Sequence, residues 1–131
     1  MNKEIIKKKL KKLSVLFVDD ETLVTETMKD ILPMLFNEAY YAIDGYEGLE
    51  QYMSNRPDVV ITDLSMPHLD GLSMIRQIKK INQETKIICI SGHNEQRSMD
   101  ACKTLNCGYI VKPINSKVLF EVLDDVLRTS N

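Results

Sequence analysis

The chain has 131 residues, 44% of them hydrophobic and 27% charged, a composition typical of one globular domain large enough to bury a core. No apolar run approaches the roughly 20 residues that cross a bilayer, and the N-terminus lacks the apolar segment of a signal peptide, so we expect a cytoplasmic protein. The net charge is −2, but the first 12 residues hold six lysines and one glutamate, and the remaining acidic body does not indicate a domain that binds nucleic acid directly.

Residues 1–12 form a lysine-rich N-terminal extension ahead of the predicted domain, which we place at residues 13–129. Ile6, Leu10 and Leu13 recur at helical spacing, with lysines between them. A helix that docks on an anionic membrane or on a partner protein would show this pattern. One short stripe is a weak signal, so we favour a frayed, solvated extension.

Strands and helices are predicted to alternate along the rest of the chain. Five apolar runs predict strands, at residues 13–18, 38–43, 58–62, 86–90 and 109–111. Apolar positions at helical spacing predict helices at about residues 21–36, 46–55, 72–81, 95–105 and 115–127. Pro33 should kink or shorten the first helix. Asp44 and Glu47 have the spacing of a capping box, and Asp70 is a plausible N-cap.

This alternation predicts an α/β fold in which helices cover both faces of a parallel sheet. We expect a doubly wound, flavodoxin-like three-layer (βα)5 sandwich with five strands in the order 2-1-3-4-5. The cysteines are Cys89, Cys102 and Cys107; they form no C-x-x-C pair and indicate neither a disulfide framework nor a zinc site. Cys89 lies in a predicted strand and should behave as a small hydrophobic residue.

Polar side chains stand at the carboxyl ends of the predicted strands. On its own, Asp63 is equally consistent with an aspartate that caps a turn. In the predicted order, however, it would meet Asp19, Asp20, Ser91 and Lys112 at one edge of the sheet, where such sheets bind ligands. Three crowded carboxylates with no histidine or cysteine nearby suit Mg²⁺. A carboxylate can attack phosphorus to form an aspartyl phosphate, with lysine and serine available to contact the phosphoryl oxygens.

Four motifs at these strand ends resemble those of the receiver domain of two-component response regulators. They are FVDDE at residues 17–21, ITDLSMP at 61–67, ISG at 90–92 and YIVKP at 109–113. The resemblance extends over about residues 13–127. It implies a signalling domain in two-component phosphorelays that assists its own phosphotransfer and autodephosphorylation, and that is not an enzyme in the usual sense. It also implies a monomer or a weak phosphorylation-dependent dimer.

The resemblance further implies that Asp63 accepts a phosphoryl group from a histidine kinase or a phosphotransfer protein. Asp20, Asp63 and the backbone carbonyl of Ser65 would bind Mg²⁺, for which Mn²⁺ can substitute, and Asp19 would act mainly through metal-bound water. Ser65 also occupies a variable position that should tune the lifetime of the aspartyl phosphate. His93 stands at a second such position, where we favour a solvated loop residue over one that steers water, and His68 should be a surface residue.

By the same resemblance, Lys112 pairs with the phosphoryl group, and its bond to Pro113 is cis. Ser91 would move toward the phosphate while Tyr109 swings inward. This would remodel the face made by the fourth helix, the fifth strand and the fifth helix, where an unidentified downstream protein would dock. Residues 105–108 depart from the family, which usually has a Gly-Ala pair there. This departure bears on the geometry with which the fourth helix ends, and not on the chemistry of the site.

The residues count against two other function classes. Phosphatases of the haloacid dehalogenase type place a second acid two residues after the nucleophile, where this chain has Ser65. A flavodoxin-like cofactor binder needs a phosphate-cradling loop after the first strand, where this chain has Asp19, Asp20 and Glu21. A receiver could also be a module excised from a longer regulator. We favour a stand-alone one because the lysine-rich start begins with Met1.

Overall fold

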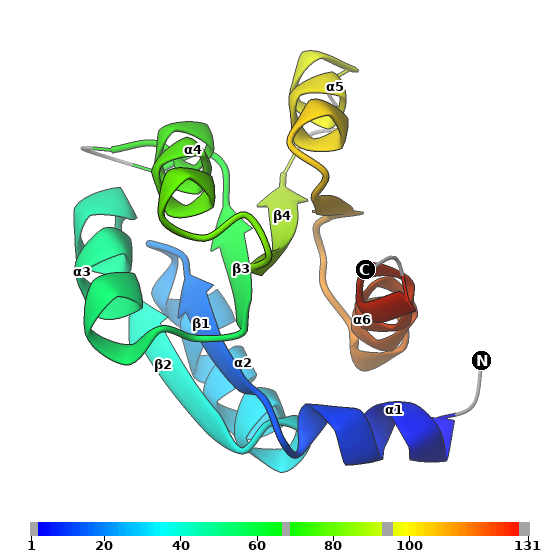
Figure 1. Ribbon diagram of the computed structural model, residues 1–131. Coiled ribbons are helices and arrows are strands. Elements are labelled where there is room, and N and C mark those ends of the chain that lie inside the picture. Colours follow the sequence, from blue (N-terminus) through cyan, green and yellow to red (C-terminus); the bar gives the residue numbers. More distant parts are fainter. Residues whose placement is uncertain (1–2, 67–68, 93–95, 129–131) are drawn as a thin grey trace.

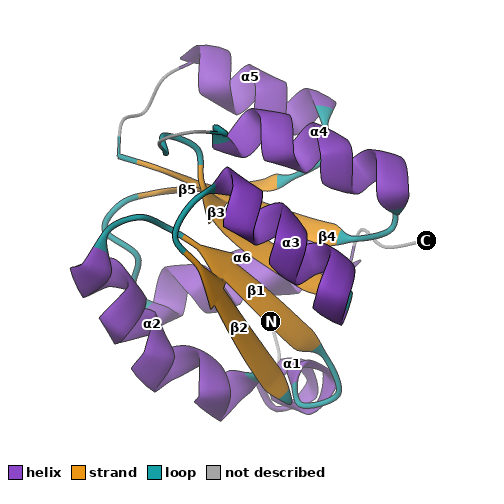
Figure 2. Cartoon of the chain, turned by 90° about the vertical axis from the view of Figure 1, so that its left-hand side faces the viewer, coloured by secondary structure: helices purple, strands orange, loops and turns teal. Residues whose placement is uncertain are grey.

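The computed structural model describes residues 3–66, 69–92 and 96–128. Five parallel strands form one sheet between two layers of helices (Figures 1 and 2). The strands are β1 Ser14–Val18, β2 Glu38–Ala42, β3 Val59–Asp63, β4 Lys86–Ser91 and β5 Gly108–Val111. Their order is β2-β1-β3-β4-β5, so the predicted doubly wound topology is confirmed.

Six helices surround the sheet in the described part of the chain. They are α1 Lys3–Leu10, α2 Thr22–Leu35, α3 Gly45–Asn55, α4 Gly71–Ile81, α5 Gln96–Thr104 and α6 Ser116–Arg128. The boundaries of α2 to α6 lie within about one residue of the prediction, apart from the expected start of α5 at residue 95, which lies outside the described residues. Pro33 does not break α2, which continues past it to Leu35. None of the helices described here is long and apolar enough to cross a membrane.

The central strands β1, β3 and β4 are buried on both faces because each face packs against its own layer of helices. In β1, Val15 and Phe17 belong to the core shared with α1, α2 and α6, whereas Leu16 and Val18 belong to the core shared with α3, α4 and α5. Figure 2 shows these two layers on opposite sides of the sheet. A central strand of this kind is a continuous apolar run, which is why such runs predicted the strands well.

The predicted starts of α3 and α4 are confirmed by their caps. The carboxylate of Asp44 accepts a hydrogen bond from the backbone N–H of Glu47 at 2.8 Å, and that of Asp70 accepts one from Ser73 at 2.9 Å. The Glu47 carboxylate accepts from the backbone N–H of Ile43 at 3.1 Å, one residue before the N-cap, which extends the capping box by one position.

Residues 105–108, where the sequence departs from the family pattern, form a regular helix end. Asn106 has a left-handed backbone with φ of 59°. Its N–H donates to the carbonyl of Lys103 at 3.0 Å, and the N–H of Cys107 donates to the carbonyl of Cys102 at 2.8 Å. This is the Schellman arrangement, in which asparagine can take the left-handed position usually held by glycine. Asn106 therefore ends α5 without the family's Gly-Ala pair.

The expectation of a frayed, solvated N-terminal extension is wrong. Residues 3–10 form α1, and the side chains of Ile6 and Leu10 are only 3% and 0% exposed. Both belong to the core that α2 and α6 share with the sheet. The apolar stripe thus packs on the domain itself, and only the lysine-rich side of α1 faces outward. The alternative in which this stripe docks on a membrane or a partner is therefore not supported either.

Leu10→Ala should lower the free energy of unfolding by roughly 2–5 kcal/mol, because it removes a fully buried side chain and leaves a cavity beneath α1. Denaturant unfolding would measure the change. Lys9→Ala is the matched control, since Lys9 is exposed on the same helix and its replacement should change stability little. Equal stability of Leu10→Ala and wild type would mean that α1 contributes nothing to the folded core.

Candidate functional site

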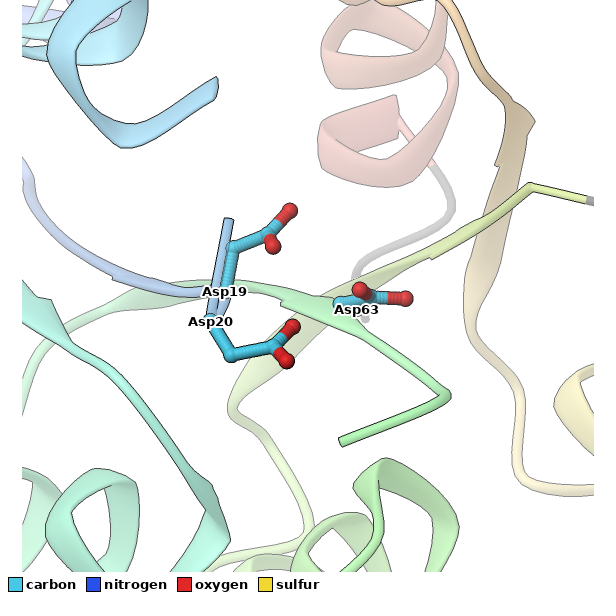
Figure 3. Close-up of side chains that lie close together, drawn as sticks. All are labelled: Asp19, Asp20 and Asp63. Carbon is cyan, nitrogen blue, oxygen red and sulfur yellow. The ribbon is translucent and has the colours of Figure 1, made fainter. Parts of the chain in front are cut away.

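Three carboxylates converge at the carboxyl edge of the sheet. Asp63 is the last residue of β3, and Asp19 and Asp20 directly follow β1, which is its parallel neighbour. Each of the three offers an oxygen, and these oxygens all lie within 4.8 Å of one another. Figure 3 shows the three side chains pointing to the same side of the chain. Asp19 and Asp63 are buried, whereas Asp20 is exposed to solvent.

The two buried carboxylates are oriented by backbone hydrogen bonds. One oxygen of Asp19, Oδ1, accepts a hydrogen bond from the N–H of Glu21 at 2.8 Å, and Oδ1 of Asp63 accepts one from Ser65 at 3.2 Å. The other oxygen of each faces Lys112, whose Nζ lies 3.3 Å from Oδ2 of both aspartates. The predicted meeting of Asp19, Asp20, Asp63 and Lys112 is therefore present in the structure.

Lys112 also has a partner that the sequence analysis did not identify. Its Nζ forms an ion pair with the carboxylate of Glu21, whose side chain is 57% exposed. Burial alone would lower the pKa of Lys112, but the hydrogen bond to Glu21 and the charges of Asp63 and Asp19 outweigh it and raise the pKa. The lysine is therefore charged throughout the physiological pH range. Nothing in the spacing of Glu21 indicates that it reaches a residue 91 positions away.

The electrostatics of the cluster suit a bound cation. Burial and the nearby Asp63 charge raise the pKa of Asp19, although the Glu21 N–H and Lys112 act in the opposite direction. Oδ2 of Asp19 is a buried oxygen without a well-directed hydrogen bond, and it faces the ammonium of Lys112 at 3.3 Å. All the donors are oxygens, which is the ligand type that Mg²⁺ prefers. Asp19, Asp20 and Asp63 could therefore hold a divalent metal ion.

A model of the response regulator receiver domain family matches residues 15–124. The chain belongs to this family. It is 34% identical to the chemotaxis protein CheY of Thermotoga maritima over 114 residues, which cover 86% of this chain and 95% of that protein. The identity and coverage are the same for CheY of Halobacterium salinarum.

Solved receiver structures have the same fold. A response regulator receiver domain protein from Clostridium thermocellum is 29% identical, with a TM-score of 0.81 over 88% of this chain and 94% of that one. A complex of CheX, CheY, BeF3 and Mg²⁺ from Borrelia burgdorferi gives a TM-score of 0.81 at 25% identity, over 88% of this chain and 89% of that one. Receiver domains are signalling modules that partner with histidine kinases or phosphotransfer proteins. This family match decides against the phosphatase and flavodoxin alternatives.

The remaining residues predicted for the receiver site lie on β4 and β5. Ser91 is the buried last residue of β4, on the strand that pairs with β3 beside Asp63. Tyr109 is half-buried on β5, where it packs against the core that α3, α4 and α5 cover. The peptide bond between Lys112 and Pro113 is cis, as the resemblance implied. His68 and His93 lie outside the described residues.

Gly71 is a part of the receiver site that the sequence analysis missed. A Cβ atom at this position would lie 2.4 Å from the backbone oxygen of Asp63 and 2.8 Å from the Cα of Leu64. The N–H of Gly71 donates to the carbonyl of Leu64 at 3.1 Å. The first residue of α4 therefore packs directly against the backbone that carries Asp63, and only glycine fits there without moving it. The Asp-Gly pair at residues 70–71 was a possible signal, but we interpreted it only as a helix cap.

Proposed function

We propose that this receiver domain accepts a phosphoryl group on Asp63 with the help of Mg²⁺, and that it then changes the face formed by α5, β5 and α6. The observation that supports this most directly is the position of Lys112 Nζ, 3.3 Å from both Asp19 and Asp63 at the end of the sheet. A buried carboxylate beside a fixed cation and a metal-binding cluster has the parts that phosphoryl transfer requires.

In this proposal, Mg²⁺ would be bound directly by Asp20, Asp63 and the backbone carbonyl of Ser65. Asp19 would contact the ion mainly through a water molecule bound to it. The ion would supply positive charge to the incoming phosphoryl group, and Mn²⁺ would substitute for it. The Borrelia CheY structure, which is named as a complex with BeF3 and Mg²⁺, supports the choice of metal by analogy. The buried Asp19 oxygen that lacks a hydrogen bond supports it from this chain's own residues.

The nucleophile would be the carboxylate of Asp63, which the Ser65 N–H already orients. Its oxygen attacks phosphorus while the bond to the donor's histidine nitrogen breaks, so the group passes from histidine to aspartate. Lys112 would then contact a phosphoryl oxygen. Before transfer, the carboxylate of Glu21 is paired with Lys112. The Glu21 side chain is exposed, so it can move toward solvent when the phosphoryl group takes its place beside the lysine. Loss of the group by autodephosphorylation is part of the same proposal.

The response would begin at Ser91 and Tyr109. A phosphoryl group brings a charge of about −2 and three acceptor oxygens, so it favours the arrangement in which the Ser91 hydroxyl lies close enough to donate. Tyr109 lies on the neighbouring strand with its ring half-buried, and a change in its burial would alter much apolar contact area. The two residues would thus connect the phosphate to the outer face of β5.

The donor would be a histidine kinase or a phosphotransfer protein in the cytoplasm, and the output would be docking of a downstream protein on the altered face. We expect a monomer, or a weak dimer when phosphorylated, without direct binding to nucleic acid. We place the receiver domain at residues 13–129 and treat the lysine-rich residues 1–12 as an N-terminal extension whose helix α1 packs on that domain. Phosphotransfer assays against a panel of histidine kinases would identify the donor.

Metal dependence tests the proposed chemistry. With a small phosphodonor, the protein should gain one phosphoryl group by intact mass when Mg²⁺ is present, and none when a chelator removes it. Asp20→Asn should raise the Mg²⁺ concentration needed for half-maximal labelling by at least about tenfold, because it removes one of few carboxylate ligands. Asp30→Asn is the control, since Asp30 is exposed on α2. Labelling that persists in the chelator would rule out the metal.

A further inference from the structure

All three cysteines converge on one face of the sheet, although they are far apart in the sequence. Cys89 lies in the middle of β4, Cys102 near the end of α5, and Cys107 just before β5. Cys89 and Cys102 are fully buried in the core beneath α3, α4 and α5, and Cys107 packs against the same core. The Cys89 thiol interacts with the thiols of both Cys102 and Cys107. All three are free thiols.

The turn that ends α5 joins two of these cysteines, Cys102 and Cys107, through their backbone. The backbone N–H of Cys107 donates to the carbonyl of Cys102 at 2.8 Å, which closes the Schellman turn described above. The residues in these two positions of the motif commonly contact each other through their side chains. The thiol of Cys107 thus contacts that of Cys89 on the adjacent strand, and the turn places Cys102, the other thiol that Cys89 contacts, close by along the backbone.

Only Cys107 is open to solvent. Its side chain is partly exposed and lines a surface pocket of about 310 Å³, together with Lys79, Lys86, Glu84 and Asp125. The ammonium of Lys79 donates hydrogen bonds to the backbone carbonyls of residues 83 and 85, at 3.2 and 3.1 Å.

These surroundings favour the thiolate of Cys107. The interaction with the Cys89 thiol and the charge of Lys79 lower the pKa of Cys107, although burial acts in the opposite direction. The accessible thiol is thus also the more nucleophilic one, whereas contact with the other two thiols and burial raise the pKa of Cys89. An accessible thiolate with a second thiol in reach is the arrangement of redox-sensitive cysteines.

We propose that Cys107 is a peroxide-reactive thiol and that one of its two buried neighbours, Cys89 or Cys102, closes an intramolecular disulfide with it. The thiolate of Cys107 would attack a peroxide oxygen, the O–O bond would break, and a sulfenic acid and hydroxide would form. The neighbouring thiol would then attack the Cys107 sulfur, and water would leave with the formation of the S–S bond. In sum, two thiols and one peroxide give one disulfide and two waters.

Counting thiols tests this proposal. The purified protein would be treated with hydrogen peroxide, unfolded and alkylated, and the alkyl groups counted by intact mass. We expect the alkylatable thiols to fall from three to one, with the chain still monomeric, and a reductant to restore all three. Peptide mapping should find Cys107 in the crosslink. Three thiols that stay free, a crosslink between two chains, or a crosslink between Cys89 and Cys102 would overturn the proposal.

Two variants separate the roles of the thiols. Cys107→Ser should keep both remaining thiols alkylatable after the same treatment, and loss of both at the wild-type rate would contradict the role of Cys107. The double variant Cys89→Ala and Cys102→Ala should instead convert Cys107 to acids that the reductant does not reverse. If the double variant does not fold, the wild-type crosslink map and Cys107→Ser still decide the outcome.

Discussion

Asp63→Ala is expected to abolish phosphorylation of this receiver domain completely. The replacement removes the proposed nucleophile, and neither of the two other clustered aspartates has the same setting. Asp63 is the only one of the three clustered aspartates that combines a place in a strand with contacts to both the Ser65 N–H and Lys112. Asp20 is exposed and follows β1, and Asp19 is oriented by a different backbone group. Labelling should therefore stop rather than move to a neighbour.

The measurement is intact mass after treatment with a small phosphodonor and Mg²⁺. Wild type should gain one acid-labile phosphoryl group and Asp63→Ala none. Asp30→Ala provides the control, because it removes an exposed carboxylate from α2 and should label as wild type does. The parallel pairing of β3 with β1 and β4 is made by backbone groups, so the variant should keep its sheet. Equal labelling of wild type and Asp63→Ala would refute the assignment.

The sequence predicted the sheet and most of the acidic site because both follow from local rules. Apolar runs alternating with helical stripes define a parallel sheet, and parallel strands bring their carboxyl ends to the same edge. Asp63 and Lys112 each stand directly at such an end, so their meeting required only the strand order. Helix caps such as Asp44 were equally accessible, because the capping residue and the amide that it accepts from are three positions apart.

What the sequence did not predict depends on contacts between distant segments. The stripe of Ile6 and Leu10 was visible, but the surface that buries it is formed by other helices, and a short stripe does not identify its partner. The pairing of Glu21 with Lys112 joins the loop after β1 to the residue that follows β5. The need for glycine at position 71 arises from the backbone of Asp63, which no local pattern encodes.

The three cysteines illustrate the same limit. Their spacing of 13 and 5 residues matches no metal or redox motif, and the sequence therefore suggested an inert core residue at Cys89. Register places Cys89 opposite Tyr109 across β4 and β5, which brings it near the start of β5 where Cys107 lies. The Schellman turn at Asn106 then adds Cys102. The cysteine cluster therefore results from the topology of the fold and not from the spacing of the cysteines in the sequence.

Lys112→Ala should leave the domain able to accept a phosphoryl group but unable to pass the change to Tyr109. The phosphoryl oxygens would lose the cation that fixes their position, while the metal ion would still be available to offset their charge. Without a fixed phosphoryl group, nothing draws the Ser91 hydroxyl toward Asp63, and the population shift toward the active arrangement should be lost. The expected result is a mass gain like that of wild type without the accompanying change at Tyr109.

The ring resonances of Tyr109 in NMR spectra, recorded with and without phosphodonor, would report this change. In wild type they should shift on phosphorylation, and in Lys112→Ala the shift should disappear. Lys117→Ala is the control for general loss of charge, because Lys117 is exposed at the start of α6. An unchanged response of Tyr109 in Lys112→Ala would contradict the proposed coupling.

Lys112→Met distinguishes charge from packing in this test. The lysine side chain is only 17% exposed, so its methylene stem occupies space that alanine would leave empty. Methionine keeps an apolar stem of similar length but carries no charge. If coupling depends on the ammonium group, both variants should lose the Tyr109 response. If the Tyr109 response instead survives in Lys112→Met and vanishes in Lys112→Ala, the coupling depends on packing. The shape of the side chain would then matter, and its charge would not.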